Sequence, residues 1–186
     1  MKKILCVLAV FSVLIIQSFA FGGPEFGIGS GYIFYGNKET RTRNSLLNSP
    51  GQMVLNTSAG YHFPLADPVR LYAGVEGAFD LRWDGGNHIY MFDYAALIGF
   101  QIYPGLAGLM FTVDYAFGHR SDWVSIGTTE GWEHSEWGNG FKIGIQYDFL
   151  HNVFSYSPVI GVSWRRMPRG DGADNILSVF LKLTIN

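Results

Sequence analysis

The segment RLYAGVEGAFDLRW, residues 70–83, decides the fold because its side chains alternate in character with a period of two. Its odd-numbered residues carry no charge, whereas four even-numbered ones do: Arg70, Glu76, Asp80 and Arg82. Successive side chains of a β-strand point to opposite faces, so this period is that of a strand. The segment therefore predicts a strand with one uncharged face and one face of small and charged residues.

The same alternation recurs along the rest of the chain. The other segments are 26–34, 53–63, 89–103, 109–118, 137–149, 156–166 and 176–186. Eight strands are an even number, as single-chain outer-membrane barrels require, and no segment shows a helical period. The polar face is largely Gly, Ala and Ser, which suits the crowded interior of a narrow barrel better than the wet face of a soluble sandwich.

The connections between these strands alternate in length. The short ones are 64–69, 104–108 and 150–155, and the longer or more polar ones are 37–52, 84–88, 119–136 and 167–175. Short periplasmic turns and longer external loops are typical of such barrels, which places the N-terminus on the periplasmic side. Aromatic residues at strand ends predict two interface girdles: Trp83, Trp137 and Trp164 externally, and Tyr61, Phe63, Tyr103, Tyr147, Phe149 and Tyr156 on the periplasmic side.

The first twenty residues have the layout of a secretory signal peptide. Two lysines precede an apolar run of roughly 13 residues, shorter than the ~20 that a spanning helix needs. Ser18-Phe19-Ala20 follows, with small residues flanking a variable one. We expect cleavage after Ala20, which leaves residues 21–186 as one barrel domain in the bacterial outer membrane.

Composition excludes several other classes of protein. Charged residues are only 15% of the chain, and the mean hydropathy of +0.13 does not fit a helical membrane protein. The single cysteine, Cys6, lies in the apolar run, so the mature chain has no disulfide. Without residues 1–20 the net charge is 11 − 15 = −4, which gives no attraction to nucleic acid. We expect no cofactor and no metal, because no histidine pair has zinc-ligand spacing with a third ligand nearby.

Together the signal peptide, the eight alternating strands and the loop asymmetry resemble the small outer-membrane barrels typified by OmpX, OmpW and the membrane domain of OmpA. The resemblance covers the whole mature chain and is architectural. It implies contact with outer-membrane lipid, insertion by the barrel-assembly machinery, and a monomer.

Ten charged residues fall on the face predicted to line the lumen: Arg70, Glu76, Asp80, Arg82, Asp93, Asp114, Lys142, Asp148, Arg165 and Lys182. Charges cost several kcal/mol when they face lipid near the midplane, so they should point inward. Buried charges need partners, and Asp114 is the first candidate for Lys142 because their strands are neighbours. The network either plugs the lumen or gates a pore by exchanging pairs, as the OmpA resemblance allows. Because a barrel of eight strands leaves little free space inside, the structural plug is favoured over the gated pore.

The longer connections carry eight candidate binding residues: Lys38, Arg41, Arg43, Trp123, Trp132, Arg169, Gly170 and Asp171. Loop 37–52 is basic, and loop 119–136 is acidic with two tryptophans. Exposed tryptophans indicate contact with lipid, glycan or protein, or else packing between loops. Arg169-Gly170-Asp171 matches an adhesion tripeptide of other proteins, and loop exposure is its only support.

An enzymatic alternative starts from His119-Arg120-Ser121, whose spacing is that of the barrel lipid A deacylase family. Glu130, Glu133 or Glu136 would have to orient the base, and Asp122 stands where that family has Asn. His134-Ser135-Glu136 is a weaker match. Because spacing alone does not define a triad, we predict a non-catalytic barrel that is structural or binds an external ligand or host surface. The alternatives are a narrow gated pore or OmpW-like conduit for small or hydrophobic solutes, and a lipid A-modifying enzyme.

Overall fold

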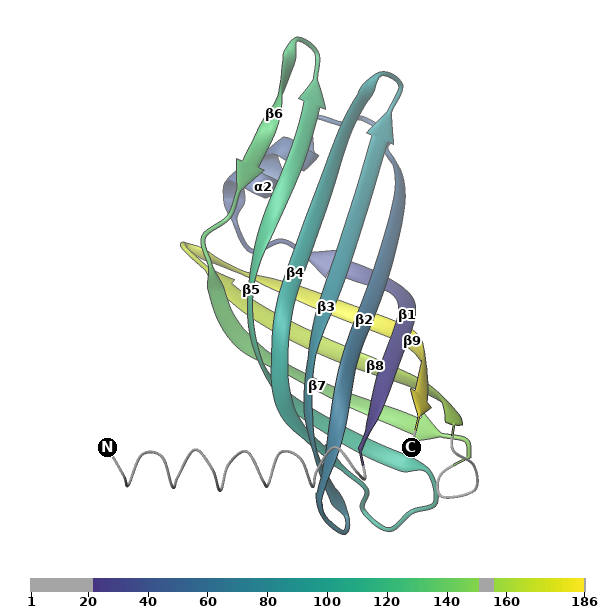
Figure 1. Ribbon diagram of the computed structural model, residues 1–186. Helices are drawn as coiled ribbons and strands as arrows, with labels where there is room; N and C mark the ends of the chain where they lie inside the picture. The colour runs from purple at the N-terminus through teal and green to yellow at the C-terminus, as the bar shows by residue number, and fades with distance from the viewer. Residues whose placement is uncertain (1–21, 151–155, 186) are drawn as a thin grey trace, which may run out of the picture.

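The computed structural model describes residues 22–150 and 156–185 (Figure 1). The predicted signal peptide and most of the connection 150–155 lie outside the described residues. Within them the elements are, in chain order, β1 (Gly23–Phe34), α2 (Lys38–Asn44), β2 (Gly51–Ala66), β3 (Val69–Asp84), β4 (Asn87–Ile102), β5 (Leu109–Ile126), β6 (Thr129–His134), β7 (Gly138–Asp148), β8 (Tyr156–Arg169) and β9 (Gly172–Ile185).

Eight of these strands close into a barrel in which every neighbour is antiparallel. The order around the barrel is β1, β2, β3, β4, β5, β7, β8 and β9, and β9 pairs again with β1. The remaining strand, β6, pairs with the upper part of β5 above the point where β7 leaves it. The predicted fold, an eight-stranded antiparallel up-and-down barrel, is confirmed.

The alternation in the sequence becomes the difference between the two faces of the wall. On β3 the side chains of Tyr72, Glu76 and Asp80 are buried in the interior, whereas Val75 is 59% exposed on the outside. The same holds on β9, where Lys182 is buried and Leu181 and Leu183 are exposed. Apolar residues therefore cover the outer wall and polar ones fill the interior, the reverse of a water-soluble protein and the arrangement of a membrane-spanning barrel.

Two of the connections that we expect to be external are shorter than predicted, because the strands continue beyond the expected ends. The segment 119–136 is largely the β5–β6 hairpin, which turns at Gly127 with a φ of +62°. Segment 167–175 is mostly the ends of β8 and β9, which turn at Gly170 with a φ of +52°. Positive φ favours glycine, so these turns were readable as tight hairpins.

The first external connection contains a helix that the sequence reading did not predict. The side chain of Asn37 accepts a hydrogen bond from the Thr40 backbone at 3.1 Å and caps α2. At seven residues α2 is too short to show a helical period. Its neighbour Leu47 is buried against interior residues of the barrel: Ile33, Tyr35, Ala78, Ile89, Met91, Val124 and Ile176. Among the described residues, no helix has the length and apolarity needed to cross a membrane.

The hairpins β3–β4 and β5–β6 rise well above the turn between β8 and β9, so the external rim is uneven (Figure 1). Trp83 and Trp137 are exposed on the outer wall near this rim, and Phe149 and Tyr156 are exposed at the opposite end. Tyr103 departs from the predicted girdle because it is 7% exposed and faces the interior.

Candidate functional site

The candidate site is the charged interior of the barrel and its external mouth. The structure places all ten predicted lumen residues on inward-facing positions. Eight are buried, and Arg70 and Arg82 are half-buried. Arg70 lies over the ring of Tyr103, with 4.8 Å from its guanidinium carbon to the ring centre.

Four of these charges form an alternating chain in the interior of the barrel. Lys142 binds Glu76, and the Nε of Arg165 lies 3.6 Å from the same carboxylate. Arg165 also binds Asp93, whose other oxygen accepts a hydrogen bond from Arg169 at 2.6 Å. Because each charge has an opposite neighbour, the cost of burying it is offset by attraction and hydrogen bonding.

The chain continues to the external mouth through residues that the sequence reading had assigned to loops. Arg169 also binds Asp174 at 2.9 Å, and Arg120 binds the same carboxylate at 2.5 Å. The Nε of Arg120 donates to Asp122 at 3.0 Å. Acidic and basic groups thus alternate from Lys142 to Asp122 along the interior, across β7, β3, β8, β4, β9 and β5.

Helix α2 binds the end of this series of charges that lies at the mouth of the barrel. Arg43 of the helix binds Asp122 of β5 and Glu133 of β6. Arg120 donates to the Thr40 hydroxyl at 2.8 Å. The helix therefore covers the mouth and is held there by charged hydrogen bonds in addition to apolar contacts.

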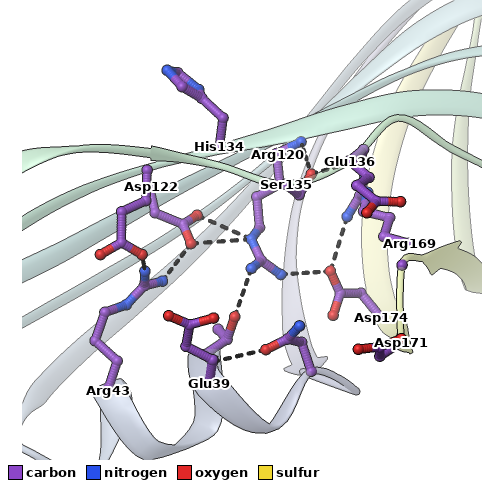
Figure 2. Close-up of a pocket in the computed structure, with 14 residues that line it drawn as sticks. Glu39, Arg43, Arg120, Asp122, His134, Ser135, Glu136, Arg169, Asp171 and Asp174 are labelled. Carbon is purple, nitrogen blue, oxygen red and sulfur yellow. Dashed lines mark hydrogen bonds and ion pairs between the residues drawn. The ribbon is translucent and has the colours of Figure 1, made fainter.

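A cavity of about 230 Å³ remains at the mouth between α2, the β5–β6 hairpin and the β8–β9 turn (Figure 2). Its walls carry three arginines, Arg43, Arg120 and Arg169, and six carboxylates, which are Glu39, Asp122, Glu133, Glu136, Asp171 and Asp174. The arginines are all engaged by the charge chain, so the cavity has an excess of negative charge.

A second, much smaller cavity lies near the start of the charge chain. The space bounded by Glu76, Lys142, Lys182 and Phe180 measures about 10 Å³. That is about the space of one water molecule.

Three other predicted lumen residues, Asp80, Arg82 and Lys182, form ion pairs outside the main chain of charges. Asp80 accepts hydrogen bonds from Tyr35, Gln52 and Arg82, each at 2.8 Å. Lys182 lies 3.5 Å from Glu25, a buried acid of β1 that the sequence reading missed.

The prediction that Lys142 pairs with Asp114 was wrong. Asp114 stands directly opposite Lys142 in the β5–β7 register, but the ammonium group binds Glu76 across the barrel instead. A lumen this narrow lets a long side chain reach a strand that is not its neighbour, which strand adjacency alone does not reveal.

The eight loop candidates are divided between the surface and the interior. Lys38, Arg41, Trp132 and Asp171 are exposed, and Gly170 lies in the β8–β9 turn. The Trp123 indole donates to His88 Nε2 at 3.2 Å. The predicted exposure of Arg169 was wrong, because its side chain is 4% exposed and binds Asp93 and Asp174. The Arg-Gly-Asp tripeptide is therefore not presented as a unit.

The serine and histidines of the enzymatic alternative lie on the outer face of β5 and β6. The hydroxyl of Ser121 is 3.0 Å from His134 Nδ1, and His119 Nδ1 is 2.8 Å from the Tyr94 hydroxyl. Glu133 binds Arg43 on the inner side. Within the described residues no carboxylate is hydrogen-bonded to either histidine, and no three metal-ligating side chains form a metal site.

The missed residues were detectable in the sequence. Gly118, Arg120, Asp122 and Val124 continue the inward alternation of β5, and all four are buried. The polar composition of 119–136 hid this pattern. Asp174 was hidden in the same way at the start of β9.

This closed eight-stranded barrel, with a polar interior and an apolar wall, has the architecture of the small outer-membrane β-barrels. Among solved structures, the chain is similar to the crystal structure of Neisserial surface protein A, with a TM-score of 0.53 and 12% identity over 87% of this chain and 95% of that one. It is also similar to the crystal structure of Ail, the attachment invasion locus protein of Yersinia pestis, with a TM-score of 0.53 and 13% identity over 88% and 97%. No protein-family model and no curated protein matches the sequence.

Proposed function

We propose that this chain is a non-catalytic protein of the bacterial outer membrane that anchors an external binding surface. The barrel is the anchor, and the raised β3–β4 and β5–β6 hairpins carry the surface. Residues 1–20 direct export and are then removed, so the mature chain begins at Phe21.

The observation that carries this proposal is the protruding β5–β6 hairpin. Trp132 on β6 is 54% exposed, and among the described strands β6 pairs only with β5. Its other edge has unpaired backbone groups, which can pair with an extended segment of a partner. A large exposed aromatic beside a free strand edge is typical of an interaction surface.

The paired charges of the interior support an anchor over a conduit. Glu76 with Lys142, and Asp93 with Arg165, are buried ion pairs between strands that are not neighbours, so opening a path there would require breaking them. The name of one similar structure, an attachment invasion locus protein, agrees with a binding role at the cell surface.

A binding assay on whole cells tests this function. Bacteria that display the full chain should adhere to immobilised matrix proteins, glycans or host cells better than bacteria without it. Trp132→Ala should remove this gain because it truncates the exposed ring on the raised hairpin. Trp137→Ala is the matched control, since Trp137 is 60% exposed but lies beside the barrel wall, stacked on Phe117.

Two further measurements separate the alternatives. Recording across planar bilayers should show no conductance steps, and discrete steps would favour the pore. A mass shift of lipid A after expression would favour the enzyme. N-terminal sequencing of the membrane-extracted protein should begin at Phe21, and a sequence that begins at Met1 would contradict the processing.

A further inference from the structure

The barrel wall is split between β1 and β2 in its external half. Pairing of these strands runs from Gly23 opposite His62 to Gly29 opposite Asn56 and then stops. Beyond that point β1 continues along β9, and β2 continues along β3 (Figure 1). A single side chain bridges the start of the split, where the Ser30 hydroxyl donates to the Val54 carbonyl at 2.7 Å.

A cleft of about 450 Å³ lies at this split. It is lined by the end of β1, by α2 and by β3, through Tyr32, Ile33, Phe34, Tyr35, Arg41, Asn44, Ser45 and Arg82. Two of its residues are arginines and none is acidic. The cleft is therefore cationic, in contrast to the acidic cavity at the mouth.

The two arginines have donors to offer a ligand. Arg41 is exposed in the last turn of α2, and no ion pair or side-chain hydrogen bond engages it within the described residues. Arg82 uses Nε and Nη2 on Asp80, and Nη1 takes no part in that pair. Asp80 already accepts from Tyr35 and Gln52, so Arg82 is fixed in place while part of its guanidinium group stays available.

Two aromatic residues of β1 form the outward-facing apolar part of the cleft, whereas Ile33 and Tyr35 are buried. Tyr32 and Phe34 are 49% and 54% exposed, and their ring centres are 4.6 Å apart. Below them on the same face of β1, Ile28 is 58% exposed. A track of apolar side chains thus runs from the cleft down the wall that faces lipid.

Unpaired backbone groups make the split costly in pure hydrocarbon. Where β1 and β2 separate, their facing edges lose strand partners, and each unsatisfied group would cost several kcal/mol in the lipid core. An occupant with hydrogen-bonding groups at the height of the split would satisfy the unpaired backbone groups. Apolar chains beneath those groups would match the apolar outer wall.

We propose that this cleft binds the phosphate-bearing headgroup of an outer-leaflet lipid. The phosphate lies between Arg41 and Arg82, because guanidinium groups are well matched to phosphate oxygens. Acyl chains follow Phe34, Tyr32 and Ile28 down the wall. The site rests on the proposed residence of the chain in the outer membrane, with the long connections outside.

The test uses the full chain, purified and folded in detergent, with dioctanoyl phosphatidic acid as the probe and native mass spectrometry as the readout. We expect phosphatidic acid to bind in preference to dioctanoyl phosphatidylcholine. Arg41→Glu should weaken binding about tenfold or more, because it removes a charged hydrogen bond and adds repulsion. Lys38→Glu is the matched control, since it makes the same change of charge on the same helix but lines a different groove, which does not include Arg41.

Each outcome decides the site. Unchanged binding by Arg41→Glu, equal losses from both variants, or equal binding of phosphatidylcholine would overturn it. Inorganic phosphate should compete poorly, and competition equal to that of the lipid would overturn the claim that a lipid is the ligand. Folding of each variant is checked by the heat-dependent gel shift of barrels. If a glutamate variant does not fold, Arg41→Gln or Lys38→Gln replaces it at the same position. Recovery of the chain outside the membrane fraction would instead overturn the proposed residence.

Discussion

Substitution of Val75 by Arg is the strongest test of which face of the wall meets lipid. Val75 is 59% exposed on the outer face of β3, and its partners on the neighbouring strands are Ala59 and Ala96. Neither alanine can bind a guanidinium group. Val75 is six residues from the start of β3 at Val69. With a rise of ~3.3 Å per residue and a tilt of ~40°, it lies about 15 Å above that end, near the membrane midplane.

The expected loss of folding free energy is on the order of 2–4 kcal/mol, the cost of an arginine on the lipid face near the midplane. Leu106→Arg is the matched control, because Leu106 is 64% exposed but lies in the β4–β5 turn, outside the strands. Its cost should be roughly 0–1 kcal/mol, as at an interface.

The assay is urea-dependent unfolding from lipid vesicles, followed by the heat-dependent gel shift and by tryptophan fluorescence. Val75→Arg should unfold at a lower urea concentration than wild type, and Leu106→Arg close to it. If Val75→Arg is as stable as wild type, the assignment of the outer wall to lipid is refuted. A one-residue error in register would reverse every face, so the result bears on the whole barrel.

Two further changes test the interior and the orientation. Glu76→Leu should cost about 3–5 kcal/mol because Lys142 loses its partner in the lumen. Adding Lys142→Met should restore part of that loss, and a double variant less stable than the single one would contradict the pairing. Protease added to intact cells should cut the β5–β6 turn at 127–128 and spare the β4–β5 turn at 104–108, and the opposite pattern would mean that the barrel is inverted.

The strands were predictable from the sequence because the membrane enforces their pattern. A lipid-facing position tolerates few charges, so alternation survives in segments such as 70–83 and identifies both faces. Strand ends were less accurate, since β5 rises beyond the membrane to Ile126 and no longer needs an apolar outer face there. Ser121 and Ser125 on that face made the strand resemble a loop.

The partners of the interior charges could not be read from the sequence. The pattern shows which side chains point inward, as it did for Lys142 and Glu76, but contacts across the lumen depend on the tilt and stagger of all eight strands. Helix α2 was not predicted from the sequence for a different reason. Its fixed position comes from tertiary contacts, among them Arg43 with Asp122, and not from its seven residues alone.

The separation of β1 from β2 also affects how the barrel assembles. β1 shares ten residue pairs with β9 but only seven with β2. Its principal partner is therefore β9, the last of the described strands, about 150 residues later in the chain. Until β9 arrives, β1 has one short ladder and an open edge, so it gains most of its stability in the final step of closure. A chain truncated before β9 would deprive β1 of its longer ladder. The remaining strands would then form an open sheet, because the barrel closes only through β9.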